Sequence, residues 1–322
     1  MFDAGAPWAA RGGEGLSGFG GVEVWRGSVN AWECDEMGHM NVRFYLARAR
    51  EGLVGTMAAL GMEGAFRDSG DATALVLDHH VRFIREARAG APLFMRAGLI
   101  SLGESDARIL QLIIHAGSGE IAASVQTLVR HATAREGRPF SWSRRTRDLA
   151  PGLLMAVPDR AAPRGLALDP SAGDAALSAA NRLNLACIGA GAFGPADTDV
   201  FGRVRPDVMI GRISDGVPTM NEEVGAPPPP PPRIGGAVLE YRLAYLAWPR
   251  AGDRFEIRSG LTGFDSRVRR VVHWIIDPAS GGAWASAEAV AVALDLDARR
   301  IIDIDAETRV RLGARRVTGL RF

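Results

Sequence analysis

Apolar residues in the first half of the chain follow two different periods. From Val42 to Leu60 they recur every three or four residues, which is the spacing of one face of a helix. The stretch from Val22 to Trp32 and four stretches after the helix have the β-rich composition of strands. The later strands are predicted at 74–84, 93–101, 108–115 and 121–131. Short turns separate the last three strands, which predicts an antiparallel meander.

The same order of elements recurs in the second half of the chain. Arg88-Ala89-Gly90 matches Arg250-Ala251-Gly252 at a shift of 162, and over about 42 residues roughly a third of the aligned positions are identical. The second copy is predicted to have a strand at 183–192, a helix at 206–214 and further strands between 238 and 295. A period this long indicates a duplicated domain and not a solenoid.

Two insertions interrupt the symmetry of the copies. Residues 140–176 are rich in Pro, Arg and Ala, and we interpret them as the linker between the copies. Residues 227–232 are six consecutive prolines, which predicts an extended polyproline spacer. With a loose tail at 1–20, the predicted domains are 21–139 and 177–322.

These patterns predict an α+β protein in which each half is a five-stranded antiparallel sheet wrapped around one long helix. Such a sheet has one apolar face, and a helix of about five turns can cover it. Two sheets of this kind can also pair edge to edge and hide their edge strands.

Composition narrows the classes of function. The 322 residues carry a net charge of +1, so no bulk charge favours nucleic acid or an anionic membrane. All 38 basic residues are arginine, which excludes a Schiff-base or Walker-type lysine. Two cysteines are too few for a disulfide framework. No apolar run is long enough to span a membrane. We therefore expect a cytoplasmic protein.

The strongest candidate for chemistry is the turn before the first helix. It reads Asp35-Glu36-Met37-Gly38-His39-Met40-Asn41, and Tyr45 follows on the helix. A degenerate copy keeps Asp199 and Gly202, whereas Arg203 and Arg205 replace His39 and Asn41. Asp35 stands where a helix presents unpaired backbone N–H groups and the positive end of its dipole.

These residues resemble the motif of the hot-dog fold, specifically the 4-hydroxybenzoyl-CoA thioesterase-like family. The matching positions are Asp35, Gly38, His39, Met40, Asn41 and Tyr45. With the order of helix and strands, the resemblance covers most of both halves and implies a tandem double hot-dog protein. The second copy, with only Asp199 and Gly202 retained, is interpreted as a decayed or repurposed site.

The resemblance implies hydrolysis of an acyl-CoA or acyl-carrier-protein thioester, without a cofactor or metal. The catalytic set would be Asp35, Gly38, His39 and Asn41, with Asp35 acting as nucleophile or as base to a water. The substrate-binding candidates are Tyr45, His79, Arg82 and Arg88. One of the adjacent His79 and His80 is expected to face the helix and the acyl pocket, because neighbouring strand residues point to opposite faces.

Other interpretations remain open on the sequence. Asp35 could be only a helix cap, Tyr45 fits the apolar core, and the arginines could form a solvated edge. A hot-dog dehydratase or hydratase would pair His39 with a carboxylate of the other half. A non-catalytic module would bind acyl-CoA without turning it over. The sequence also leaves open a homo-oligomer of double hot-dog chains.

Overall fold

The computed structural model describes residues 20–168, 173–223, 234–298 and 300–322. Most of the predicted tail and all six consecutive prolines lie outside these residues. Within them the strands form one 11-stranded sheet in the order β1-β3-β4-β5-β2-β7-β10-β9-β8-β6, with β11 beside β10. Every paired strand runs antiparallel to its neighbour.

The two halves repeat one series of elements. The first half contains β1 (Val22–Ser28), the 3₁₀ turn η3 (Ala31–Glu33), α1 (Val42–Ala59), β2 (Ala72–Phe83), β3 (Pro92–Leu102), β4 (Asp106–His115) and β5 (Ile121–Thr133). Between the halves lie α2 (Arg144–Leu149), η4 (Ala150–Leu153), η5 (Asp159–Ala161) and α3 (Leu177–Arg182). The second half contains β6 (Ala186–Ala192), η6 (Pro195–Asp197), α4 (Pro206–Glu223), β7 (Ile234–Tyr245), β8 (Arg254–Phe264), β9 (Val268–Ile276), β10 (Ala283–Asp295), β11 (Arg300–Ile301) and α5 (Ala306–Ala314).

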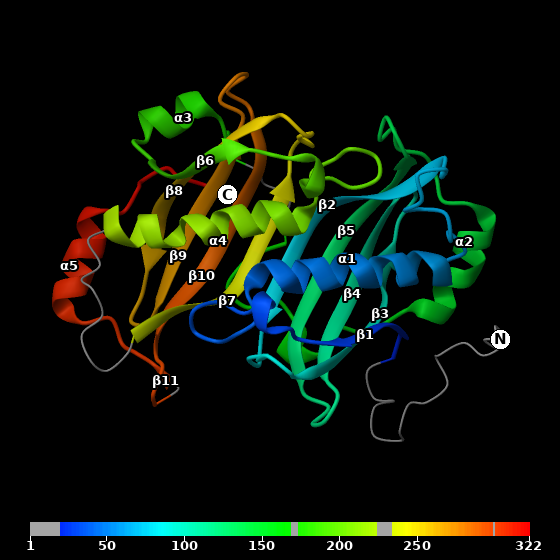
Figure 1. Cartoon of the computed structure of the whole chain (residues 1–322), viewed down its shortest axis with the longest axis horizontal. Coiled ribbons are helices and arrows are strands. Elements are labelled where there is room, and N and C mark those ends of the chain that lie inside the picture. Colours follow the sequence, from blue (N-terminus) through cyan, green and yellow to red (C-terminus); the bar gives the residue numbers. More distant parts are fainter. Residues whose placement is uncertain (1–19, 169–172, 224–233, 299) are drawn as a thin grey trace.

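The halves meet at one seam of the sheet, where β2 pairs with β7. His80 lies opposite Arg242 in this register, and Val81 lies opposite Tyr241. The long helices α1 and α4 lie across the same face of the sheet (Figure 1). An apolar core fills the space beneath them near the seam, with Leu46, Val81 and Ile213 almost fully buried. The predicted two-repeat α+β architecture is confirmed, and the sheet of the two halves is continuous.

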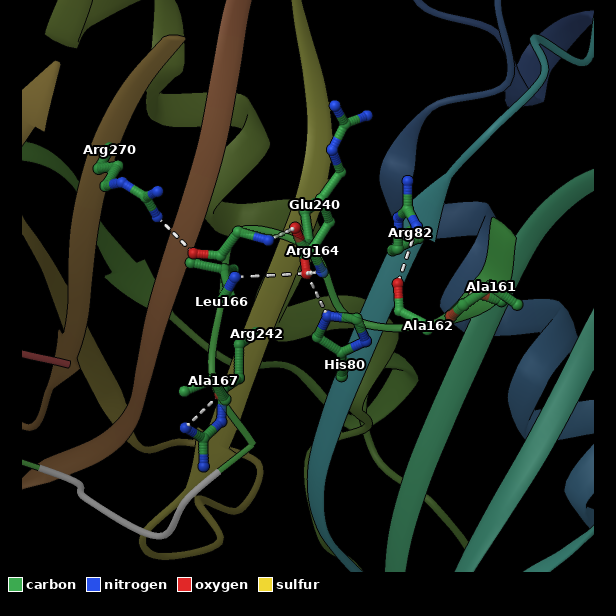
Figure 2. A network of polar contacts seen from close by, with 12 residues as sticks. His80, Arg82, Ala161, Ala162, Arg164, Leu166, Ala167, Glu240, Arg242 and Arg270 are labelled. Atoms are coloured by element: carbon green, nitrogen blue, oxygen red, sulfur yellow. Dashed lines mark hydrogen bonds and ion pairs between the residues drawn. The ribbon is translucent and has the colours of Figure 1, made fainter. Parts of the chain in front are cut away.

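The segment after η5 crosses the opposite face of the sheet at this seam (Figure 2). Glu240 of β7 accepts backbone N–H bonds from Arg164 at 3.0 Å and Gly165 at 2.6 Å. His80 Nε2 lies 2.6 Å from Glu240 Oε1, and Arg82 Nη1 donates to Ala162 O at 2.7 Å. Buried side chains of both halves thus hold the connecting chain against the sheet.

The duplication extends beyond the strands. Ser143 Oγ accepts the Thr146 N–H at the start of α2, and Asp305 Oδ1 accepts the Thr308 N–H at the start of α5. The chain after each helix then forms a parallel bridge to a strand, Leu154 with Leu99 in the first half and Arg316 with Leu261 in the second. Segments 142–154 and 304–316 are therefore structural counterparts.

Several predicted boundaries differ from the structure, and two of the differences have a clear physical reason. The opening strand ends at Ser28 and not at Trp32, because the Asn30 N–H donates to Glu33 Oε2 at 2.8 Å and closes a 3₁₀ turn. Helix α4 continues to Glu223 and not to Ser214, although Pro218 lies inside it. A Cβ on Gly216 would meet Ile188 O at 2.7 Å, so this glycine lets the helix pack closely on β6.

Candidate active site

The acidic turn folds tightly around the Asp35 carboxylate. Asp35 Oδ1 accepts the backbone N–H groups of Met37 at 3.0 Å and His39 at 3.1 Å. The Asp35 N–H donates to His39 O at 2.8 Å, and the Gly38 N–H donates to Asp35 O at 2.9 Å. Gly38 has φ +78°, a left-handed conformation that glycine adopts without a steric penalty. Glycine at this position is therefore required by the backbone of the turn.

Residues 199–203 form a second turn with the same hydrogen bonds. Asp199 Oδ1 accepts the N–H groups of Phe201 at 2.8 Å and Arg203 at 2.9 Å. The Asp199 N–H donates to Arg203 O at 2.7 Å, the Gly202 N–H donates to Asp199 O at 3.0 Å, and Gly202 also has φ +78°. Because both aspartates occupy the same kind of backbone loop, only the surrounding side chains can distinguish the two sites.

His39 and Arg88 lie together beside the Asp35 turn. His39 forms a backbone bridge with Arg88, and His39 Nε2 lies 3.0 Å from Glu86 Oε2. Arg88 Nη2 lies 3.5 Å from the same Glu86 oxygen, and its side chain is 57% exposed. The His39 side chain is 12% exposed, so its ring is reached by solvent only in part. The Glu86 carboxylate, the His39 imidazole and the Arg88 guanidinium therefore lie together on one side of the turn.

Asn41 joins the turn to both long helices. Its Oδ1 caps α1 by accepting the Arg43 N–H at 3.0 Å, and its Nδ2 donates to Ser214 Oγ of α4 at 3.1 Å. Met37 packs against the start of β7, since a Cβ on Gly235 would lie 2.4 Å from the Met37 sulfur. The Asp35 turn therefore lies where the first half contacts the second, beside the positively polarised start of α1.

Tyr45 is part of the apolar core beneath this turn. It is 4% exposed and packs edge-on against Phe83, with ring centroids 5.1 Å apart. Burial raises the pKa of the Tyr45 hydroxyl, and the negative charge of Asp35 adds to this effect. The tyrosine is consequently held in its neutral form close to the turn.

His79 faces the helices, whereas His80 faces the connecting segment. His79 Nδ1 lies 2.8 Å from Tyr245 Oη, and burial lowers the pKa of His79 to about 3. Because the histidine is neutral, its hydrogen bond with the tyrosine places no charge inside the apolar core. His79 thus links the two halves through Tyr245.

Arg82 is separated from the other candidate residues. Its guanidinium lies on the far face of the sheet, where it contacts the connecting segment through Ala162 O (Figure 2). The structure therefore brings together Asp35, Gly38, His39, Asn41 and Arg88, with Tyr45 beneath them, and leaves Arg82 outside this group.

The side chains around the second turn have structural partners. Arg203, 6% exposed, donates to the backbone carbonyls of Ala134 and Arg135 in the first half. Arg205 Nη1 donates to Ala196 O at 2.7 Å, and Arg205 Nε lies 3.3 Å from Asp207 Oδ1. The arginines that replace His39 and Asn41 therefore anchor the second turn to the rest of the molecule.

An ion pair that was not predicted from the sequence lies next to each turn. It joins an acid just before the turn to an arginine of the helix that follows. Arg48 of α1 binds Glu33, and Arg212 of α4 lies 3.4 Å from Asp197. Each acid also accepts the N–H of the residue three positions earlier, Asn30 or Gly194, at 2.8 Å. The sequence could have revealed these pairs. The acid and the arginine of the first pair are each separated from their counterparts in the second pair by the same number of residues as Asp35 is from Asp199.

Two classes of feature are missing from the part of the chain that the structure describes. It holds no group of three or more His, Cys, Asp or Glu side chains suited to a metal ion. None of its helices is both long and apolar enough to cross a membrane.

Known structures with the same fold cover most of the chain. The putative oleoyl thioesterase of Lactobacillus plantarum matches 83% of this chain and 94% of its own, with 12% identity and a TM-score of 0.63. The 12:0-ACP thioesterase of Umbellularia californica matches 82% and 95%, with 14% identity and a TM-score of 0.62. An acyl-ACP thioesterase of Bacteroides thetaiotaomicron matches 83% and 96%, with 9% identity and a TM-score of 0.60.

A curated relative matches a shorter region. The L-carnitine dehydrogenase/betainyl-CoA thioesterase of Rhizobium meliloti is 27% identical over 110 residues, which are 34% of this chain and 22% of that protein. The chain thus spans only about a fifth of the length of this relative.

The family model for the thioesterase-like superfamily matches twice, over residues 29–152 and 193–312. Each match contains one acidic turn and the long helix that follows it. The two matches together span more than half of the chain, and the chain belongs to the thioesterase-like superfamily.

Proposed function

We propose that this protein hydrolyses the thioester of an acyl-CoA or an acyl carrier protein and releases a free acid and a thiol. The observation that carries the proposal is the Asp35 turn, placed at the start of α1 and in contact with α4 through Asn41 and Ser214. Membership of the superfamily and the shared fold of named thioesterases support the same reaction.

The chemistry requires a nucleophile and donors for the developing oxyanion. In our proposal Asp35 either attacks the thioester carbon, giving an acyl anhydride that water then hydrolyses to the free acid, or removes a proton from a water that attacks this carbon directly. In both cases the C–S bond breaks, and the thiolate leaves and takes up a proton. Backbone N–H groups near the start of α1 would face the carbonyl oxygen. One such donor typically contributes about 2.7–4 kcal/mol to the transition state of acyl transfer.

The neighbouring side chains would have supporting roles. We propose that His39 and Asn41 orient the thioester or the water, that Gly38 shapes the turn, and that exposed Arg88 meets the phosphates of the carrier. Tyr45 and His79 would bound the acyl site from the core. The contact of Arg82 with Ala162 favours a structural role for that residue over substrate binding.

The second copy would be structural. Asp199 and Gly202 keep the turn, while Arg203 and Arg205 supply contacts to the backbone and to Asp207. We further propose that each half is a hot-dog unit with five main strands around one long helix. The domain division at 21–139 and 177–322 remains a prediction, with the counterpart segments 142–154 and 304–316 favouring a first unit that extends past residue 139.

The test compares Asp35→Asn with Asp199→Asn. Asparagine keeps an oxygen that can accept the two backbone N–H groups, so both variants preserve the turn while removing the charge. We expect Asp35→Asn to lower kcat/KM by about 10²–10⁴-fold, the usual contribution of a positioned acid or base. Asp199→Asn should retain wild-type turnover. Released thiol is measured with a thiol-reactive dye over a panel of acyl-CoA chain lengths.

Thermal melts of both variants serve as the control for folding. Undiminished turnover by Asp35→Asn, with a wild-type melting temperature, would remove Asp35 from the mechanism. Equal losses in the two variants would show that the turn acts only structurally.

The hydratase alternative is not favoured. It requires His39 to act with a carboxylate of the other half, whereas the proteins of known structure that share the fold are named thioesterases. Crotonyl-CoA hydration, followed by loss of the enoyl absorbance, would detect that activity.

A further inference from the structure

A cavity of about 720 Å³ opens in the second half, away from the Asp35 turn. Its lining comes mainly from β8, β9, α5 and the end of α4. Helix α5 lies at the opposite end of the sheet from α2 (Figure 1). Its lining includes Met220, Ser259, Leu261, Arg269, Val271 and Leu312. This volume lies within the roughly 300–1,000 Å³ of typical small-molecule sites. The cavity therefore has room for a ligand with an apolar part.

Arg269 gives this cavity an uncompensated positive charge. Among the described residues it has no hydrogen-bond or ion-pair partner, and its Nε is buried without one. Burial lowers the pKa of Arg269, and the nearby positive charge of Arg311 lowers it further. The side chain as a whole is half-buried, and a buried N–H group without a partner is uncommon in native structures, so the Arg269 Nε needs an explanation. An anion bound in the cavity would supply one.

The first half shows that this charge is not required by the fold. Four positions carry arginine in the second half and an apolar residue in the first. In chain order these pairs are Ala107 and Arg269, Leu149 and Arg311, Leu153 and Arg315, and Leu154 and Arg316.

In the first half the same place is packed with apolar side chains. Trp142 is 2% exposed there and lies in one cluster with Leu60, Leu99 and Leu153. The counterpart of Trp142 is the smaller Ile304, which packs in a cluster with Leu261 and Leu312. The place that apolar side chains fill in the first half is therefore an open cavity with basic residues in the second half.

We propose that this cavity binds a single-chain amphiphile with an anionic head, of the class of a medium-chain carboxylate. The carboxylate pairs with the Arg269 guanidinium, which suits the two oxygens of such a group. The alkyl chain lies in the cavity beside Leu261, Val271 and Leu312, where its own apolar surface leaves water. The site is distinct from the Asp35 turn and does not depend on thioester hydrolysis there.

The test measures decanoate binding to the whole chain by calorimetry. The decisive variant is Arg269→Ala, because alanine is the residue of the first half at this position. We expect it to weaken decanoate binding at least about tenfold, which corresponds to about 1.4 kcal/mol. Arg269→Lys should recover part of the affinity. Arg85→Ala, at an exposed ion pair with Glu120 in the first half, is the matched control and should bind as the wild type does.

A melting experiment keeps the proposal testable if affinity is low. Arg269→Ala should melt above the wild type without ligand, because it removes an unpaired charge, and should lose the rise in melting temperature that decanoate gives the wild type. Decyl phosphate distinguishes a carboxylate from a phosphate head group, and decanol tests the need for charge.

Three results would overturn the proposal. These are equal decanoate affinity in Arg269→Ala and wild type, equal affinity for decanol and decanoate, and loss of decanoate binding when a non-hydrolysable S-decyl-CoA thioether saturates the protein. The last result would place decanoate at the thioester site.

Discussion

The Asp35 turn and the Asp199 turn have one backbone and two different surroundings. In both, the aspartate carboxylate accepts two N–H groups and a glycine at φ +78° closes the loop. His39 beside the first turn is partly open to solvent and pairs with Glu86, whereas Arg203 beside the second is buried against backbone carbonyls. The two turns therefore share one backbone shape and differ in the side chains beside them.

The contacts between α1 and α4 beside the two turns show the same contrast. Where the first turn approaches α4, a neutral hydrogen bond joins Asn41 to Ser214. At the symmetric contact, Asp207 is 3% exposed and lies 3.3 Å from Arg205 and 3.4 Å from Arg50. A neutral pair beside the first turn is thus matched, beside the second turn, by two arginines around a buried acid.

Breaking this pair of contacts should give the largest loss of stability. Asp207→Ala leaves two partly exposed arginines without their buried acid, and loss of hydrogen bonds to a charged group costs about 1.5–3 kcal/mol. Ser214→Ala removes one neutral hydrogen bond and should cost about 1 kcal/mol. Urea unfolding of both variants measures the difference. Equal losses would contradict the interpretation that the second contact holds the helices more strongly.

Acidification should weaken both halves by a similar amount. Burial lowers the pKa of His79 to about 3 and that of His273 to about 4, against about 6.5 in the unfolded chain. Below pH 6.5 the unfolded chain takes up protons that the folded chain refuses, so stability is present above this pH and is lost as pH falls. Each histidine should remove about 2 kcal/mol of unfolding free energy between pH 7.5 and 5.

Single substitutions separate the two contributions. His79→Gln keeps a partner for Tyr245, and His273→Gln keeps one for Ser259, which lies 2.7 Å from His273 Nδ1. Each variant should flatten the pH dependence of urea unfolding by about the same 2 kcal/mol. An unchanged slope in either variant would show that the histidine stays exposed to protons in the folded state.

Local patterns predicted the repeat and most of its elements. Helical spacing predicted α1 at 42–60, and the structure has it at Val42–Ala59. Strand composition predicted β4 and β5, which begin within two residues of their expected starts. These features depend on neighbours in the sequence, which the sequence displays directly.

The remaining features depend on contacts between distant residues. No local signal places Tyr245 beside His79, because the two meet only after β2 and β7 pair. The extension of α4 past Pro218 reflects close packing of Gly216 on β6, which overrides a pattern that usually ends a helix. Three of the four arginines that replace apolar residues in the second half become visible in the sequence only when the two copies are aligned beyond residue 139.

The smallest expected loss of stability comes from replacing the glycine of each turn, and these two variants compare the turns most directly. Gly38→Ala and Gly202→Ala place a Cβ at φ +78°, which costs about 1–2 kcal/mol in either turn. A Cβ at Gly38 meets nothing within 4 Å, and one at Gly202 meets only the flexible end of Arg250 at 3.1 Å, so the losses should be nearly equal. Thioester turnover should fall only in Gly38→Ala, because only Asp35 is proposed to act on substrate. Equal stability losses with equal loss of turnover would mean that strain, and not the position of one carboxylate, controls activity.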